Sequence, residues 1–178
     1  MKVLVTGGAG FVGSHVVDAL IEAGHHVVIV DNLWEHGGGK MENVNPKASF
    51  YKMDIRDAAL QKIFEEEQPE VICHLAAQHS VKISTDDPVH DANVNIFGLI
   101  NLLQNATRFG VRKVIFSSSG ATYGTVEKMP VDESTTVFGR SELDNPLEPD
   151  WKVRLMIPGV LEFNDSDQRA GSIDKASG

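Results

Sequence analysis

The chain has 178 residues, which is long enough for one ordinary domain with a hydrophobic core. Its hydrophobic and charged fractions, 42% and 23%, are those of a globular protein. The formal net charge is −9 and no basic stripe is present, so we expect neither nucleic acid nor a membrane surface as a partner. No apolar run approaches the ~20 residues that span a bilayer. The single cysteine, Cys73, cannot form an internal disulfide, and we therefore expect a cytoplasmic protein.

Short apolar runs alternate with longer amphipathic ones along most of the chain. The short runs are rich in Val, Ile and Phe and predict strands at 2–6, 26–30, 49–53, 71–75 and 113–118. Helical patterns lie between them at 11–23, 58–67 and 88–109. Gly24 and Gly110 follow two of these helices, and Asp87 with Pro88 predicts the start of the last one. Repeated strand–helix–strand units predict an α/β fold with a parallel sheet covered on both faces.

The character of the chain changes after about Val131. Prolines become frequent, and Asn145-Pro146 should end any helix that begins near Phe138. Residues 152–157 have the pattern of one further strand, and the polar sequence after Asn164 has little to bury. We therefore expect a domain over residues 1–143 and a divergent or truncated tail over residues 144–178.

A glycine-rich segment, TGGAGFVG, follows the first predicted strand and opens the first predicted helix. Gly8, Gly10 and Gly13 fit the spacing G-x-G-x-x-G. Glycines permit a tight turn and let a diphosphate approach the backbone, while the start of the helix supplies free N–H groups. The segment therefore predicts a dinucleotide-binding loop.

Asp31 ends the second predicted strand, at the place where a carboxylate accepts hydrogen bonds from the adenosine ribose. A carboxylate there would repel the 2′-phosphate of NADP. The next residues, Asn32 and Leu33, provide no arginine to offset that repulsion. The sequence therefore predicts NAD as the cofactor.

Two further strand ends carry candidate residues. The Asp54 carboxylate could face the adenine amine and Ile55 could cover the ring, or Asp54 could simply start the turn into the next helix. Ala76 and Ala77, after the fourth strand, are small enough to allow a dinucleotide to approach closely. His74 has no second His or Cys at ligand spacing, so we expect a structural histidine and no metal site.

These motifs together resemble those of the extended short-chain dehydrogenase/reductases, in particular NAD-dependent nucleotide-sugar epimerases of the UDP-glucose 4-epimerase type. The segments that carry the resemblance are TGGAGFVGSH, DNL, DIRD, HLAAQHSV, NIFGLINLL and FSSSGATYG. The resemblance extends over roughly residues 1–143. It implies a Rossmann-like, doubly wound parallel sheet that lacks most of the usual C-terminal substrate domain.

The resemblance also implies a set of site residues and ligands. The implied cofactor-binding residues are Gly7, Gly10, Phe11, Val12, Gly13, Asp31, Asn32, Asp54, Ile55, Leu75, Ala76, Ala77, Asn95 and Ser117. Ser119 matches the family's catalytic serine or threonine. The implied substrate is a nucleotide sugar, a UDP-hexose. The resemblance also implies a homodimer, in which the 88–109 helix and the helix that begins near Phe138 pack against their copies in the partner. Because prolines should end the second helix early, whether the chain forms this homodimer is left open.

The segment TTVFGRSEL departs from the family at the catalytic pair. The family has a tyrosine that removes a proton from the sugar 4-hydroxyl, and a lysine four residues later that lowers the tyrosine pKa. Phe138 and Glu142 stand in these two places, and neither Tyr51 nor Tyr123 is followed by a lysine four residues on. Phenylalanine has no proton to exchange, and a carboxylate would raise the pKa of any neighbouring phenol.

The sequence therefore predicts an NAD-binding, epimerase-like protein with impaired catalysis. The alternative is a non-catalytic NAD-binding module, or a truncated or degenerate paralogue. A nucleotide-sugar dehydratase or reductase is a weaker alternative, because Gly120 and Ala121 follow Ser119 where the dehydratases carry an Asp-Glu pair.

Overall fold

The structure is a computed structural model that describes residues 1–119, 123 and 130 of the chain. The chain divides into two compact units, one containing Met1–Ile115 and the other beginning at Phe116. The first unit contains nearly all of the residues described.

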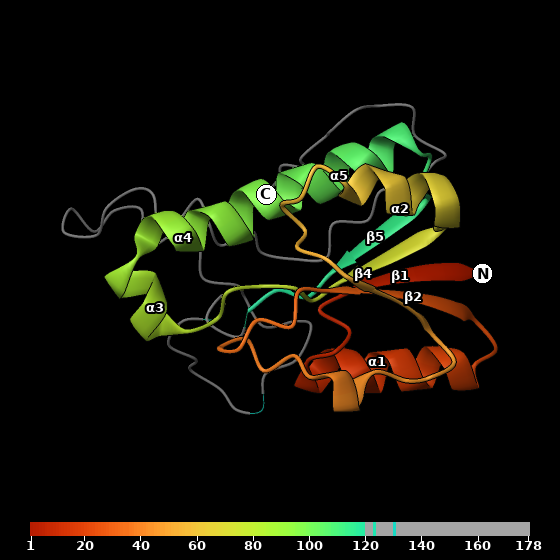
Figure 1. Cartoon of the computed structure of the whole chain (residues 1–178), viewed down its shortest axis with the longest axis horizontal. Helices are drawn as coiled ribbons and strands as arrows, with labels where there is room; N and C mark the ends of the chain where they lie inside the picture. Colours follow the sequence, from red (N-terminus) through yellow and green to blue (C-terminus); the bar gives the residue numbers. More distant parts are fainter. Residues whose placement is uncertain (120–122, 124–129, 131–178) are drawn as a thin grey trace. The chain divides into compact units, whose positions relative to one another are not determined.

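Five strands form one sheet in the order β3-β2-β1-β4-β5 (Figure 1). The strands are β1 (Lys2–Thr6), β2 (His26–Asp31), β3 (Ser49–Lys52), β4 (Val71–His74) and β5 (Lys113–Phe116). The pairs β1–β2, β1–β4 and β2–β3 are parallel, and the central residue Val5 lies opposite Ile29 on one side and Cys73 on the other. The strand order reverses between β1 and β4, and ligands of such sheets bind outside the carboxyl ends of the strands at that point.

Helices cover both faces of the sheet, as the sequence predicts. The helices are α1 (Phe11–Glu22), η1 (Met41–Asn43), α2 (Leu60–Glu67), α3 (Val81–Asp86), α4 (Pro88–Ala92), the π-helical η2 (Asn93–Phe97) and α5 (Gly98–Arg108). In Figure 1, α1 lies on one side of the sheet and α2 and α5 lie on the other. The helices α3 and α4 extend past the carboxyl ends of the strands, where a ligand is expected (Figure 1).

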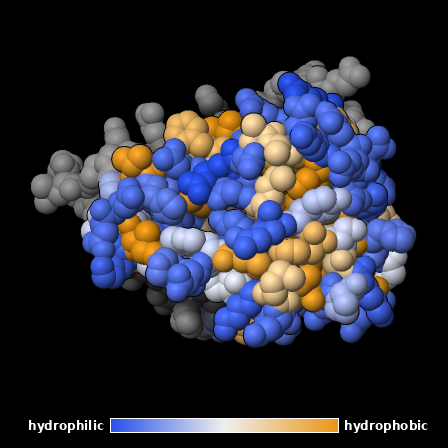
Figure 2. Space-filling view, in the orientation of Figure 1, coloured by the Kyte–Doolittle hydropathy of each residue, from blue (hydrophilic) through white to orange (hydrophobic). Residues whose placement is uncertain are grey.

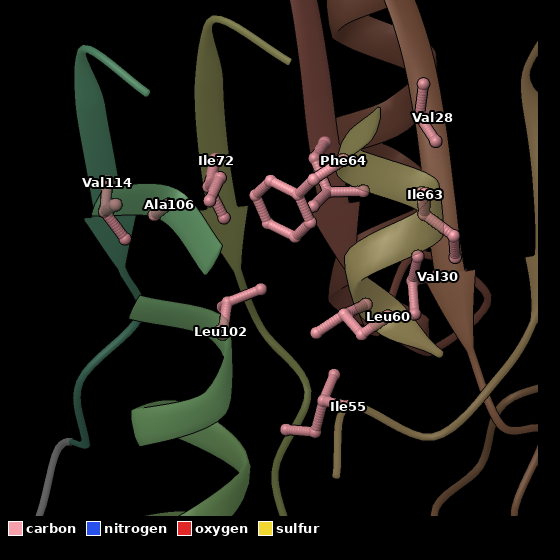
Figure 3. Packing of buried hydrophobic residues seen from close by; sticks show 11 residues of the cluster. Val28, Val30, Ile55, Leu60, Ile63, Phe64, Ile72, Leu102, Ala106 and Val114 are labelled. Carbon is pink, nitrogen blue, oxygen red and sulfur yellow. The ribbon is translucent and has the colours of Figure 1, made fainter. Parts of the chain in front are cut away.

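Two hydrophobic clusters hold these layers together. The cluster beneath α2 and α5 contains Leu4, Val28, Val30, Ile55, Leu60, Ile63, Phe64, Ile72, Leu102, Ala106 and Val114 (Figure 3). The cluster beneath α1 contains Val3, Val5, Val17, Val27, Ile29, Val71 and Cys73. Alternate residues of β1 and β2 therefore enter opposite clusters, which explains why these strands are almost continuously apolar.

The structure corrects some of the expected boundaries. The helix expected at 58–67 begins at Leu60, because the Asp57 side chain accepts the Ala59 N–H and the Asp57 carbonyl accepts the Leu60 N–H. The strands expected to reach Met53 and Ser118 end at Lys52 and Phe116. The expected helix at 88–109 is present, but its middle turn is π-helical. The short helix α3 was not predicted, because none of its six residues is buried and the sequence carries no apolar period there.

Candidate functional site

The glycine loop between β1 and α1 is held by close backbone packing. Gly7 has a φ of 72°, and its carbonyl accepts the Gly10 N–H at 3.1 Å. A Cβ on Gly13 would lie 2.1 Å from the Gly7 carbonyl oxygen, so only glycine lets the first turn of α1 approach the loop. Gly10, the N-cap of α1, has no side chain to cap the helix, and the backbone N–H groups at a helix start can bind an anion.

The same loop lies against the end of β4. A Cβ on Gly7 would lie 2.7 Å from the Ala76 nitrogen. The Thr6 hydroxyl accepts the Ala76 N–H at 3.3 Å and is hydrogen-bonded to His74 Nδ1 at 2.6 Å. His74 is only 3% exposed, and burial lowers its pKa to about 4. His74 is therefore a neutral, buried link between β1 and β4, as expected for a structural histidine.

Asp31 is fixed at the carboxyl end of β2. It is 8% exposed, its Oδ2 accepts the Ala9 N–H at 3.0 Å and its Oδ1 accepts the Leu33 N–H at 2.8 Å. A Cβ on Gly39 would lie 2.7 Å from Asp31 Oδ1, so the glycine-rich loop after β2 also passes close to this carboxylate. These contacts hold the carboxylate still, which reduces the entropy lost when a ligand binds to it.

A cavity of about 100 Å³ lies at the carboxyl ends of β1, β2 and β4. It is lined by Gly7, Asp31, Asn32, Trp34, Gly37, Gly39, Arg56, Ala76, Ala77, His90 and Val94. The structure thus brings together five of the residues that the sequence singles out. The other six come from loops and from α4 and η2 of the long helix that α4, η2 and α5 form, and the sequence analysis did not name them as site residues.

Aromatic side chains form one wall of this cavity. The ring centroids of Trp34 and His90 are 5.3 Å apart, and those of Trp34 and His36 are 5.4 Å apart. His90 Nε2 is buried and has no hydrogen-bond partner among the described residues. Of these three side chains, Trp34 and His90 line the cavity. All three line a neighbouring hollow of about 620 Å³, together with Ser80, Lys82, Ile83 and Asp87.

A charged pair lies at the cavity on the side of β3. Asp54 Oδ1 accepts from Arg56 Nε at 2.8 Å and from the Arg56 backbone N–H at 2.9 Å, while Oδ2 accepts from Arg56 Nη2 at 2.9 Å. Asn32 Nδ2 adds a bond to Asp54 Oδ2 at 2.8 Å. The hydrogen bond from the Arg56 side chain lowers the Asp54 pKa to about 2. Asp54 therefore forms the turn after β3, which was one of its two expected roles, and its role towards adenine stays a prediction.

The Ile55 side chain, between Asp54 and Arg56 in the sequence, packs into the hydrophobic core. It is 5% exposed and belongs to the cluster beneath α2 and α5. A Cβ on Gly98 would lie 2.7 Å from Ile55 Cδ1, so α5 begins with a glycine where it crosses this side chain. The expected contact between Ile55 and an adenine ring is therefore a prediction for the bound state.

A buried polar network fixes the segment after β4. Gln78 is 4% exposed, and its side chain bonds to the Ser80 backbone and to Asp91 Oδ1. The Asn95 amide pairs with both backbone groups of Gln78 and also donates to Asp91 Oδ1. The sequence motifs included Asn95, but they gave no reason to join it to Gln78 and Asp91.

The remaining predicted residues have fewer structural constraints. Phe11 and Val12, in the first turn of α1, are exposed, and Leu75 is half-buried beneath the loop. Ser117 and Ser119 follow β5 and are exposed. Phe138 and Glu142 lie outside the described residues.

Comparison with known proteins identifies the chain's relatives. Residues 4–142 match the family described as GDP-mannose 4,6 dehydratase. The chain belongs to the extended short-chain dehydrogenase/reductases, the family of NAD-dependent epimerases and dehydratases. Its five-stranded parallel sheet with helices confirms the Rossmann-like fold that the family resemblance implies.

Several relatives of this short-chain dehydrogenase/reductase are UDP-glucose 4-epimerases. One from Mycolicibacterium smegmatis is 46% identical over 84% of the chain. The structure of UDP-glucose 4-epimerase from Thermotoga maritima with UDP-glucose is 48% identical, with a TM-score of 0.69 over 77% of the chain. That of the Thermus thermophilus enzyme in complex with NAD is 44% identical, with a TM-score of 0.70 over 77%. The chain spans less than half of each relative, 46%, 44% and 44% of their lengths respectively.

Within the part of the chain that the structure describes, no helix combines the length and apolar character needed to cross a membrane. The same residues contain no group of three His, Cys, Asp or Glu side chains placed to hold a metal ion.

Proposed function

We propose that this protein binds NAD through the cavity at the carboxyl ends of β1, β2 and β4. The observation that carries the proposal is the Asp31 carboxylate, which is fixed on the same small cavity as Gly7, Ala76 and Ala77. The Thermus thermophilus relative, whose structure is described as a complex with NAD, supports it.

The chemistry of these residues suits a dinucleotide. Each Asp31 oxygen accepts one backbone N–H, and a carboxylate has about four acceptor positions. Asp31 can therefore still accept from two ribose hydroxyls. The N–H groups at the start of α1 would meet the diphosphate, and the small side chains of Ala76 and Ala77 would let the dinucleotide pass over the end of β4. The proposed cofactor-binding set is Gly7, Gly10, Phe11, Val12, Gly13, Asp31, Asn32, Asp54, Ile55, Leu75, Ala76, Ala77, Asn95 and Ser117.

We further propose a nucleotide-sugar epimerase-like role with impaired catalysis. Bound NAD would supply the hydride acceptor and donor for a transient oxidation at the sugar C4. Ser119 is the candidate for holding the sugar hydroxyl proton. Phe138 and Glu142 supply neither the acid–base group nor the positive charge that the reaction needs. Loss of a positioned acid–base group costs about 10²- to 10⁴-fold in rate.

A calorimetric titration with NAD tests the binding proposal. We expect saturable binding to the wild type and at least tenfold weaker binding to Asp31→Asn and Asp31→Ala. The matched control is Glu35→Gln, which removes a negative charge from an exposed side chain of the same loop. Absence of heat from millimolar NAD with folded protein would overturn the proposal.

An epimerase assay tests the catalytic part. We expect no conversion of UDP-glucose to UDP-galactose above background by a protein that binds NAD. The double substitution Phe138→Tyr with Glu142→Lys restores the family's pair, and it should raise any epimerase activity if that pair is what is missing. Measurable turnover by the wild type would contradict impaired catalysis.

The second candidate is a non-catalytic NAD-binding module, and Phe138 is the observation that favours it. If the double substitution gives no activity while NAD still binds, this second candidate is preferred.

Limited proteolysis tests the proposed division into an NAD-binding domain over residues 1–143 and a tail over residues 144–178. We expect NAD to protect the first part and leave the second part unchanged. The proposed location is the cytoplasm, where Cys73 would stay reduced.

The proposed assembly is a homodimer through the long helix. Val89, Phe97 and Ile100 on this helix are 69%, 61% and 44% exposed. Burying these three side chains in an interface would remove exposed apolar surface. Apolar and polar side chains are mixed on the face of the molecule seen in Figure 2. Sedimentation velocity tests this proposal: Phe97→Glu should convert a dimer to a monomer, and a monomeric wild type would contradict it.

A further inference from the structure

The cavity proposed for NAD holds a cation as well as a carboxylate. Arg56 and Asp31 both line it, although they come from different loops. An arginine near the ribose site of a Rossmann-like fold is the usual partner of the NADP 2′-phosphate. The sequence around Asp31 contains no arginine, so the position of Arg56 is evident only in the folded chain.

The Arg56 guanidinium is already paired. Its Nε and Nη2 donate to the two oxygens of Asp54 at 2.8 and 2.9 Å, which is the two-point geometry preferred by arginine and carboxylate. Asn32, another lining residue of the cavity, donates to the same carboxylate at 2.8 Å. The side chains of Arg56 and Asp54 are 36% and 25% exposed, so the pair lies partly shielded from water.

The charges at this end of the cavity do not balance. Asp31 and Asp54 are acidic and Arg56 is basic, which gives a net charge of −1 for the three side chains. A 2′-phosphate would add further negative charge beside Asp31. Asp54 offsets the Arg56 charge, and the phosphate could take the two-point contact through Nε and Nη2 only if Arg56 left Asp54, which would leave an unpaired carboxylate.

We propose that Asp54 is a specificity-determining residue, which withholds Arg56 from a 2′-phosphate and so favours NAD over NADP. This inference rests on the proposed NAD binding and deepens it. Asp31 excludes the phosphate by repulsion, and Asp54 removes the only cation among the lining residues of the cavity that could compensate.

The test compares the dissociation constants of NAD and NADP for the wild type and three variants. Asp54→Asn removes the charge that holds Arg56, and we expect the NADP/NAD ratio of dissociation constants to fall about tenfold, the effect of one charged hydrogen bond. Asp54→Asn with Arg56→Ala should return the ratio to the wild-type value. Asp57→Asn removes the same charge three residues away, at a residue outside the cavity lining, and should leave the ratio unchanged.

Each result has a distinct meaning. No NAD binding by the folded wild type would overturn the proposed function itself. NAD binding with an unchanged ratio in Asp54→Asn, or an equal fall in Asp57→Asn, would overturn this inference alone. Asp54→Ser removes the same charge but keeps an oxygen that can accept the Arg56 backbone N–H, so it keeps the inference testable if Asp54→Asn does not fold. The NADP/NAD ratio should fall in Asp54→Ser as well, and an unchanged ratio would contradict the inference.

Discussion

Asn95 and Gln78 pair through two hydrogen bonds, in which the Asn95 side-chain amide binds the Gln78 backbone. Asn95 Oδ1 accepts the Gln78 N–H at 2.9 Å, and Asn95 Nδ2 donates to the Gln78 carbonyl at 2.9 Å. Gln78 lies one residue after Ala77, which lines the cavity. The long helix thereby fixes the position of the segment over which a dinucleotide would pass.

Replacing Asn95 should weaken both folding and cofactor binding. Asn95→Ala leaves two backbone groups of Gln78 without their partner, and we expect the free energy of unfolding to fall by about 1–3 kcal/mol. NAD affinity should fall about tenfold, because Ala76 and Ala77 are no longer held. Urea unfolding and calorimetry measure the two effects. Gln104→Ala, at an exposed position of the same helix, is the control and should change neither. Unchanged NAD affinity in Asn95→Ala would show that the pairing is structural only.

Alanine substitutions at two positions of the glycine loop, Gly13 and Gly10, should have different effects. A methyl group on Gly13 would meet only backbone atoms of Gly7 and Gly8, at 2.1–2.9 Å, so Gly13→Ala should lower the free energy of unfolding by about 3 kcal/mol or more. Gly10 has a φ of −78°, and its added methyl would lie 3.2 Å from the Gly7 carbonyl oxygen. Gly10→Ala should therefore fold with a loss of about 1 kcal/mol or less but bind NAD poorly, because the methyl would face the diphosphate. Equal stability of the two variants would contradict this distinction.

His74 should make the fold sensitive to acid. Its pKa is lowered to about 4 by burial, from an ordinary value of 6.5. The unfolded chain therefore binds a proton more readily than the folded chain, and stability is lost as the pH falls from about 6.5 towards 4. We expect His74 to contribute a loss of about 3 kcal/mol between pH 7 and pH 4. NMR titration should show this imidazole still neutral at pH 5, and a midpoint near 6.5 would contradict the prediction.

The rate at which the Cys73 thiol reacts with a reagent should report how often the sheet opens. It is the only cysteine and is 8% exposed beneath α1, and burial raises its thiol pKa. Reaction with a thiol reagent at pH 7.5 should therefore be slow and follow the population of opened molecules. NAD at about 100 times its dissociation constant should slow the reaction roughly 100-fold, because it stabilises the folded state. A rate that NAD leaves unchanged would argue against binding near β1 and β4. Cys73→Ser provides the background rate.

The sequence predicts the strands better than the turns around them. The patterns of Val and Ile locate β1 and β4 within one residue, because both faces of these strands are buried. The start of α2 is displaced by the Asp57 turn, which depends on side-chain hydrogen bonds rather than on apolar spacing. The sequence pattern does not predict the π-helical turn, which contains Asn95 and its hydrogen bond to Gln78, 17 residues earlier in the chain.

The residues of the candidate site likewise divide into those that the sequence pattern locates and those that only the folded structure brings together. The positions of Asp31 and Gly7 at the cavity could be predicted, because these residues follow the first two strands, and their role towards NAD stays a proposal. Trp34, Arg56 and His90 could not, since they lie on loops or at a helix start and meet only after the chain has folded. Asp54 was recognised from its motif, but its pairing with Arg56 needed the structure.

The π-helical turn Asn93–Phe97 sets the rotational phase between the two halves of the long helix. If these five residues took ordinary α-helical geometry with no residue removed, α4 would turn by about 100° relative to α5. Leu102 would keep its place against the sheet, whereas Asp91 and His90 would swing away from Gln78 and Trp34. The wider π-helical turn thus lets one continuous helix pack against the core at one end and line the cavity at the other.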